Sequence, residues 1–286
     1  LGITVVGDSW ADSNAMGAKY RQPKDLLLDG RNEHLLVACS GTGELEVYHT
    51  QSNRKLACVQ FDSSLDSLAR IGEGWIAACS TKSNQTHILK WSKESLQRVA
   101  TIQNSHSPVS LLWDADSQNL FTACLWSRRV EAINLADELK AWSKVEFTES
   151  SLIESMKPDS VWDVSLAPRK MICLGDGRGL LVADSFGRDL IVLDPKDGHT
   201  IVSHDFFGTS LRGFALQDNN LVTLHAMLNE FSRTDQNEIH WGVLMANDVR
   251  LIDVGLLLKE RGDRIYVGGR VNPVGVPGNG AAEPTN

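Results

Sequence analysis

The amino-acid sequence predicts an all-β protein, a β-propeller built from four-stranded blades. A short apolar segment that ends in small residues recurs along the chain, with its last residue at 39, 79, 124, 184 and 225. Each copy follows a turn rich in Gly, Asp or Asn, and most copies are followed by a second such turn and another strand. A period of roughly 40 residues with four strands is typical of a propeller blade.

Within each unit, the predicted strands come in a fixed order. Short apolar or alternating runs bounded by turn residues indicate strands joined as hairpins. The first strands are DLLLD, DSLAR, VSLLW, KMICL and RGFAL, and the second strands are LLVAC, WIAAC, LFTAC, LLVAD and LVTLH. Third strands include ELEVYHT, THILKW, VEAINL and LIVLDP, and RKLACVQF, LQRVATIQ and HTIVSHDF close three of the units.

The second strand is expected to lie second from the propeller axis, where both of its faces meet neighbouring blades. A small apolar residue suits such a crowded position, and a free buried Cys behaves as a small hydrophobe. The five cysteines are therefore interpreted as buried structural residues: Cys39, Cys58, Cys79, Cys124 and Cys173. None forms a C-x-x-C pair, and no Cys/His grouping has zinc spacing, so no metal site is predicted.

Five units are visible between about residues 22 and 268, and the whole chain 1–286 is interpreted as one propeller domain. An insertion at 135–159 contains ADELKAW, which is expected to form a short helix, and another insertion is expected at 232–263. The segment GITVV at 2–6 is expected to complete a further blade. We expect a ring of seven blades, of which this chain is a fragment lacking C-terminal blades and any downstream domain.

Composition excludes two classes of partner. The 286 residues carry a net charge of −8, whereas nucleic-acid binding needs a basic face, so no nucleic-acid partner is expected. No run approaches the roughly eighteen apolar residues of a membrane helix, so no membrane span is expected. No signal peptide is visible either.

The units resemble the YVTN-type repeats of bacterial surface and periplasmic propellers, within the broader WD40-like class. A further set is similar to the propeller region N-terminal to cytochrome c or di-haem peroxidase-like modules: LWSRR (125–129), LLVADSFG (180–187), LRGFAL (211–216), NEIHWG (237–242) and VPGNGAAEP (276–284). The resemblance implies a periplasmic or extracellular protein with a downstream haem module. This chain has no C-x-x-C-H motif, so no cofactor is expected in it.

Trp126, Arg128 and Arg129 form the first group of candidate binding residues. They lie in the turn after the third repeat's second strand. Adjacent arginines with a tryptophan can clamp a carboxylate or phosphate, or stack on a ligand. The alternative is that they brace a neighbouring blade through salt bridges.

Lys24, Arg169 and Arg212 form the second group, because each precedes or begins the first strand of a unit. Such strand starts ring the mouth of a propeller's central channel, where loops commonly bind partners. Three cations there would attract an anion although the chain is acidic overall.

His225, His240 and Trp241 lie in or next to the second insertion. They are candidates for a ligand-facing pair, or His240 for an acid or base near neutral pH. The alternative is a structural Trp-Gly corner that packs the insertion on its blade.

The segment GDSWADS (7–13) resembles the G-D-S block of SGNH-type esterases, in which Ser9 would be the nucleophile. That chemistry needs a D-x-x-H block, which is absent, so a plain turn is the preferred interpretation.

The sequence thus predicts a non-enzymatic binding or docking module of a larger exported, haem-associated protein. Its expected partner is a protein or a small anionic ligand at the propeller mouth. Two alternatives remain at this stage, an enzyme with its site at the channel mouth and an architectural cell-surface repeat.

Overall fold

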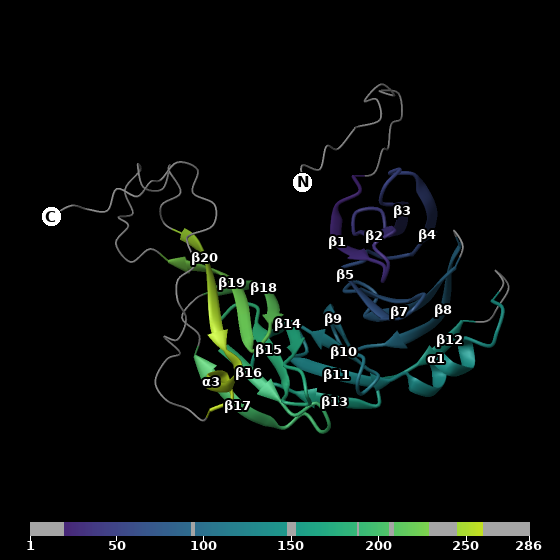
Figure 1. Cartoon of the computed structure of the whole chain (residues 1–286). Helices are drawn as coiled ribbons and strands as arrows, with labels where there is room; N and C mark the ends of the chain where they lie inside the picture. Colours follow the sequence, from purple (N-terminus) through teal and green to yellow (C-terminus); the bar gives the residue numbers. More distant parts are fainter. Residues whose placement is uncertain are drawn as a thin grey trace, which may run out of the picture.

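The computed structural model confirms an all-β propeller of successive blades (Figure 1). It describes residues 20–92, 95–147, 153–187, 189–205, 209–228 and 245–259. Five sheets follow one another in chain order along an arc. The described residues account for five blades, and the ring of seven stays a prediction.

Each blade takes its strands in chain order, with the first strand innermost. The first blade contains β1 (Pro23–Leu28), β2 (His34–Cys39), β3 (Glu44–His49) and β4 (Lys55–Gln60). The second contains β5 (Ser67–Gly72), β6 (Trp75–Ser80), β7 (Gln85–Ser92) and β8 (Ser95–Gln103). The third contains β9 (Pro108–Asp114), β10 (Asn119–Cys124), β11 (Arg129–Asn134) and β13 (Ser160–Asp163).

The fourth blade contains β14 (Pro168–Cys173), β15 (Leu180–Asp184), β16 (Asp189–Leu193) and β17 (Thr200–Asp205). The described part of the fifth contains β18 (Thr209–Gln217), β19 (Asn220–Leu228) and β20 (Met245–Asp253), followed by the one-turn helix α3 (Val254–Leu257). The first strands of successive blades contact one another in the order β1, β5, β9, β14 and β18.

The first insertion links two blades. Its helix α1 (Ala136–Trp142) coincides with the predicted ADELKAW segment, and Trp142 packs against Trp75 of the second blade. The short strand β12 (Glu154–Met156) then adds to β8 in parallel, as a fifth strand of the second blade's sheet. The chain returns to the third blade as β13, so that blade's outermost strand comes after the insertion rather than before it.

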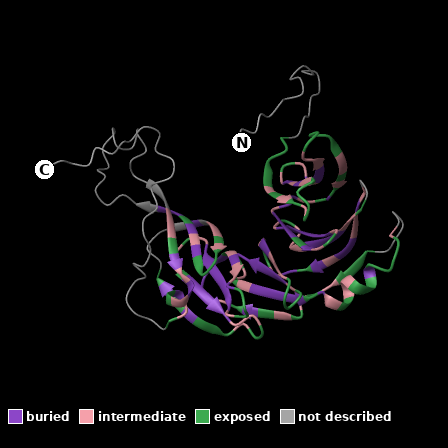
Figure 2. Cartoon of the chain, in the orientation of Figure 1, coloured by how far each residue is buried: buried purple, intermediate pink, exposed green. Residues whose placement is uncertain are grey.

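The hydrophobic core is divided into seams between neighbouring blades. The second strands of the second, third and fourth blades are buried on both faces, most completely in β6 and β15 (Figure 2). Alternate residues serve different seams: Ile76 and Ala78 pack toward the first blade, whereas Ala77 and Cys79 pack toward the third. The predicted place of the recurring segment, second from the axis, is confirmed in each blade, and cover on both sides is confirmed for β6, β10 and β15.

The register confirms that the aligned positions are equivalent. Cys39, Cys124 and Asp184 lie opposite Pro23, Pro108 and Pro168, each the first residue of its blade. The residue after each of these prolines is skipped by the pairing, which places a β-bulge at the same point of three blades. A bulge re-aims the side chain that it carries.

Two expectations about particular segments need correction. Cys58 is exposed on the outer strand β4 and Cys173 is half-buried, whereas Cys39, Cys79 and Cys124 are buried as predicted. An apolar run on an edge strand does not guarantee cover on both faces. The expected insertion at 232–263 contains β20, which pairs along β19 as the third strand of its blade.

Several sequence-based expectations lie outside the described residues, among them the strand at 2–6, Ser9, His240 and Trp241. Among the helices that the structure describes, none is long and apolar enough to cross a membrane.

Gly198 provides a test of the packing between the third and fourth blades. It lies in the turn between β16 and β17 with φ of +76°, and a Cβ there would lie 2.1 Å from the Trp162 ring. Gly177 also has positive φ, +65°, but nothing lies within 4 Å of its Cβ position. We expect Gly177→Ala to cost about 1–2 kcal/mol of unfolding free energy, from backbone strain alone. Gly198→Ala should cost about 1–3 kcal/mol more, because the indole must shift.

Urea denaturation of both variants measures the difference. Equal losses would show that Trp162 does not pack on this turn.

Candidate functional site

The strand-start face of the propeller comprises the turns before each first strand and between each second and third strand. These turns include residues 40–43, 81–84, 125–128, 164–167 and 185–187. Its most prominent feature is an exposed aromatic pair. Trp126 and Phe186 are each 62% exposed, and their rings stack with centroids 5.5 Å apart. The pair bridges equivalent turns of the third and fourth blades, so two exposed rings form one apolar surface.

The two arginines beside Trp126 have different surroundings. Arg129 Nε donates to Asp163 Oδ1 at 2.9 Å, across the β11–β13 pair of its own blade, and this interaction raises the pKa of Arg129. Arg128 is exposed with φ of +52°. Within the described ranges, its guanidinium has no hydrogen-bond or ion-pair partner. Arg128 is therefore available to a ligand, whereas Arg129 is already engaged.

Two of the three cations predicted at the channel mouth lie in the β-bulges at the strand starts. Lys24 and Arg169 are the residues skipped by the pairing in the first and fourth blades, and both are exposed. Arg169 Nη1 donates to Ser185 Oγ at 3.4 Å, next to Phe186. Arg212 lies in the irregular part of β18, between Thr209 and Gly213. The structure therefore places Arg169 against the turn that carries Phe186, while Lys24 lies two blades or more away along the chain.

His225 differs from the other candidates, because it is fully buried in β19. It occupies the second-strand position at which earlier blades have Cys or Asp. Its binding role, like those of the other predicted residues, stays a prediction.

The opposite face contains a cavity that sequence reasoning did not find. Its volume is about 790 Å³, and it lies where the turns after β1 and β5 meet the end of β9. The residues that line it and bear on its chemistry are three tryptophans, Trp75, Trp91 and Trp113, together with Arg70, Glu33 and His34. These residues are spread over three blades, so no local motif signals the cavity.

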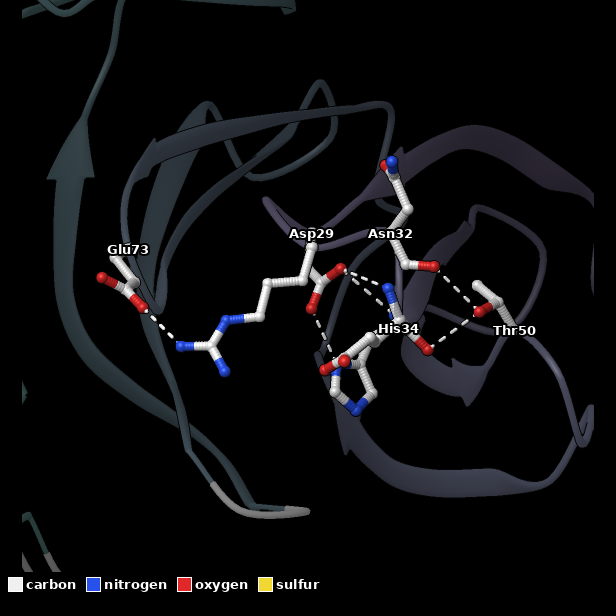
Figure 3. Close-up of polar contacts among 7 residues, drawn as sticks. Asp29, Asn32, His34, Thr50 and Glu73 are labelled. Carbon is white, nitrogen blue, oxygen red and sulfur yellow. Dashed lines mark hydrogen bonds and ion pairs between the residues drawn. The ribbon is translucent and has the colours of Figure 1, made fainter.

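One wall of this cavity is the hairpin turn DGRNEH between β1 and β2 (Figure 3). Asp29 accepts hydrogen bonds from the backbone N–H of Glu33 at 2.8 Å and lies 2.7 Å from His34 Nδ1. Burial alone would raise the pKa of Asp29, but the hydrogen bonds from His34 and Glu33 outweigh burial and lower it. The turn is thus fixed by its own carboxylate, which also orients the imidazole.

Two groups of carboxylates with a histidine lie close enough to share an ion, Asp29–Glu33–His34 and Asp194–Asp197–His199. Both belong to hairpin turns with the same Asp-to-His spacing. In the second turn, Asp197 Oδ1 accepts from the His199 backbone at 3.0 Å and lies 2.7 Å from His199 Nδ1. Asx-type hydrogen bonds within each turn account for the geometry of both groups.

The buried thiols are poor nucleophiles. Burial, with the nearby Glu46 carboxylate, raises the pKa of Cys39 to about 11, and burial raises that of Cys173 to about 12. The pKa values of Cys79 and Cys124 are raised further by burial. Because the thiolate is the reactive form, these cysteines are inert near neutral pH.

The fold defines the chain as a β-propeller, with an exposed aromatic pair on one face and a cavity on the other. Hydrazine synthase from Kuenenia stuttgartiensis has a similar structure, with a TM-score of 0.67 at 12% identity, over 86% of this chain and 66% of that one. A chain in a crystal structure of the mitotic checkpoint complex matches with a TM-score of 0.56 at 13% identity, over 80% of this chain and 62% of that one.

This chain therefore spans less than two thirds of either solved chain, and at such identities the likeness shows the fold alone. No protein-family model and no curated protein sequence matches the chain.

The burial of His87 predicts that the stability of the fold depends on pH. It is buried in β7 against Phe61, with ring centroids 4.8 Å apart, and burial together with the Arg98 charge lowers its pKa to about 4. Between pH 6.5 and pH 4 the unfolded chain therefore binds a proton at His87 that the folded chain does not. Stability should fall across this window as pH falls, by about 3 kcal/mol from this residue.

Urea denaturation at pH 7 and pH 4.5 measures the effect. His87→Gln should lose most of this pH dependence, while His199→Gln, in an exposed turn, should retain it. A His87→Gln variant with the parent's full pH dependence would refute the assignment.

Proposed function

We propose that this chain is a non-enzymatic docking module that binds an acidic segment of a protein partner on the strand-start face. The exposed stack of Trp126 on Phe186 is the observation that carries this proposal. Aromatic side chains and arginine are the residue types enriched at the energetic centres of protein interfaces. A solvent-exposed pair of large rings bridging two blades supplies apolar area without any rearrangement of the backbone.

The positive charge near the aromatic pair favours an acidic partner. Arg128 and Arg169 are exposed cations on the same two blades, and neither is paired with a carboxylate among the described residues. A carboxylate that meets an unpaired guanidinium gains a bidentate contact without displacing an existing ion pair. The proposed partner segment therefore carries Asp or Glu beside an apolar side chain that covers the aromatic pair.

The setting of the module belongs to the same proposal. The resemblance to YVTN-type propellers and to propellers preceding haem modules favours a periplasmic or extracellular protein in which haem chemistry belongs to another domain. The coding sequence after Asn286 tests this setting: a C-x-x-C-H motif in frame would support it, and a stop without one would contradict it.

The docking surface can be tested by selecting binders to the protein from a displayed library of random peptides. We expect the selected peptides to combine acidic and apolar residues. The double variant Trp126→Ala with Phe186→Ala should weaken their binding at least about 10-fold, because truncated interface anchors cost more than about 1 kcal/mol each. Arg128→Gln should weaken binding mainly at low salt.

Val161→Ala is the matched control, because Val161 is an exposed apolar residue, 48% exposed, on the outer strand of the third blade. Selected peptides that bind the double variant as tightly as the parent would refute this surface.

A further inference from the structure

The cavity on the opposite face differs in character from the strand-start face, because it is concave and combines three indoles with charges of both signs. Its volume of about 790 Å³ falls within the range of small-molecule sites, roughly 300–1,000 Å³. It lies at the far ends of β1 and β5, so it is separate from the proposed docking surface. Nothing proposed for that surface assigns a role to it.

The aromatic wall is held in place by packing between blades. Trp75 is 5% exposed and packs on Trp142 of the insertion helix, with ring centroids 5.7 Å apart. Trp91 meets the His34 ring edge-on at 5.2 Å, which connects the second blade to the first. Trp113 adds a third indole from the end of β9. Fixed indoles of this kind bind flat or apolar groups at little entropic cost.

The Arg70 guanidinium lies at the rim of the cavity and packs against the turn between β1 and β2. Arg70, near the end of β5, has its guanidinium against Gly30: a Cβ on that glycine would lie 2.7 Å from Arg70 Nη1. Arg31 and Glu73 neutralise each other across the same two turns at 3.0 Å (Figure 3). The side chain of Arg70 has no ion-pair or hydrogen-bond partner within the part of the chain that the structure describes.

The cavity lining also contains a carboxylate without a partner. Glu33 lines the cavity beside Asp29 and His34. Asp29 is satisfied by His34 and by backbone N–H groups, whereas the side chain of Glu33 has no hydrogen-bond or ion-pair partner among the described residues. The cavity therefore carries one unpaired cation and one unpaired anion around an apolar floor.

We propose that this cavity binds a small zwitterion with an aromatic or large apolar body, of the class of aromatic amino acids and dipeptides. The ligand carboxylate pairs with Arg70, the ligand ammonium pairs with Glu33, and the apolar body lies among Trp75, Trp91 and Trp113. Glu33 would repel a ligand that carries only a negative charge, and Arg70 would repel one that carries only a positive charge. A ligand with both charges therefore fits best.

Isothermal titration with L-phenylalanine and the dipeptide Phe-Leu tests the proposal, with the N-acetyl and the C-terminal amide form of each as matched probes. At least one zwitterion should bind with a Kd at or below about 1 mM. Both blocked forms should bind about 2- to 5-fold more weakly, because each loses one ion pair and the side chains that would form these pairs, Arg70 and Glu33, are exposed.

The variants assign the two charges separately. Arg70→Gln should remove the preference for the free carboxylate over the amide, and Glu33→Gln should remove the preference for the free ammonium over the N-acetyl form. Gly30→Ala should weaken binding through displacement of the Arg70 guanidinium, without a backbone penalty. Lys140→Gln, on the exposed face of α1, should leave binding unchanged.

Three results would overturn the proposal. One is that neither zwitterion binds the parent protein. Another is that the blocked forms bind as well as the zwitterions. The third is that Arg70→Gln and Glu33→Gln, folded as judged by their circular dichroism, retain the parent's preferences.

Discussion

The packing of one blade's second strand between two neighbouring blades is the constraint on which the rest of this structure depends. A four-stranded sheet cannot bury two apolar faces by itself, so each blade is completed by the next. Every residue of β6 is buried, and successive residues of that strand belong to alternate seams. Small side chains are needed where the sheets approach most closely near the axis. This requirement explains why Ala-Cys recurs at the end of the second strand in three blades.

Because the seams fix the strands, the turns at the two ends of the propeller are free to differ between blades. The same β-bulge carries Lys24, Val109 and Arg169 in three different blades, so identical backbone geometry presents different chemistry at each strand start. The aromatic pair on one face and the indole-lined cavity on the other both bridge blades. The two candidate binding surfaces therefore arise between repeats rather than within one repeat.

This origin explains what the sequence could and could not predict. The repeat predicted the blades, the order of the strands and the helix α1, because periodicity and turn residues are local signals. It did not predict that β13 completes the third blade after an insertion, nor that Cys58 is exposed on an outer strand. Glu46 and Glu131 occupy equivalent buried positions, where Glu46 pairs with Lys55 and Glu131 accepts hydrogen bonds from Asn104 and Ser105, although both resemble surface charges in the sequence. The cavity was missed because Arg70, Glu33 and Trp113 become neighbours only through the stacking of blades.

Thiol reactivity reports on the enclosure of the second strands, because three cysteines lie in the seams and Cys58 lies on an outer strand. We expect a maleimide reagent to modify Cys58 in the native protein. Cys39, Cys79 and Cys124 should react only after unfolding, since the seams bury them and burial raises their pKa values. Peptide mapping by mass spectrometry assigns each label to its residue. Native-state labelling of these three second-strand cysteines at the rate of Cys58 would show that their strands are not enclosed between blades.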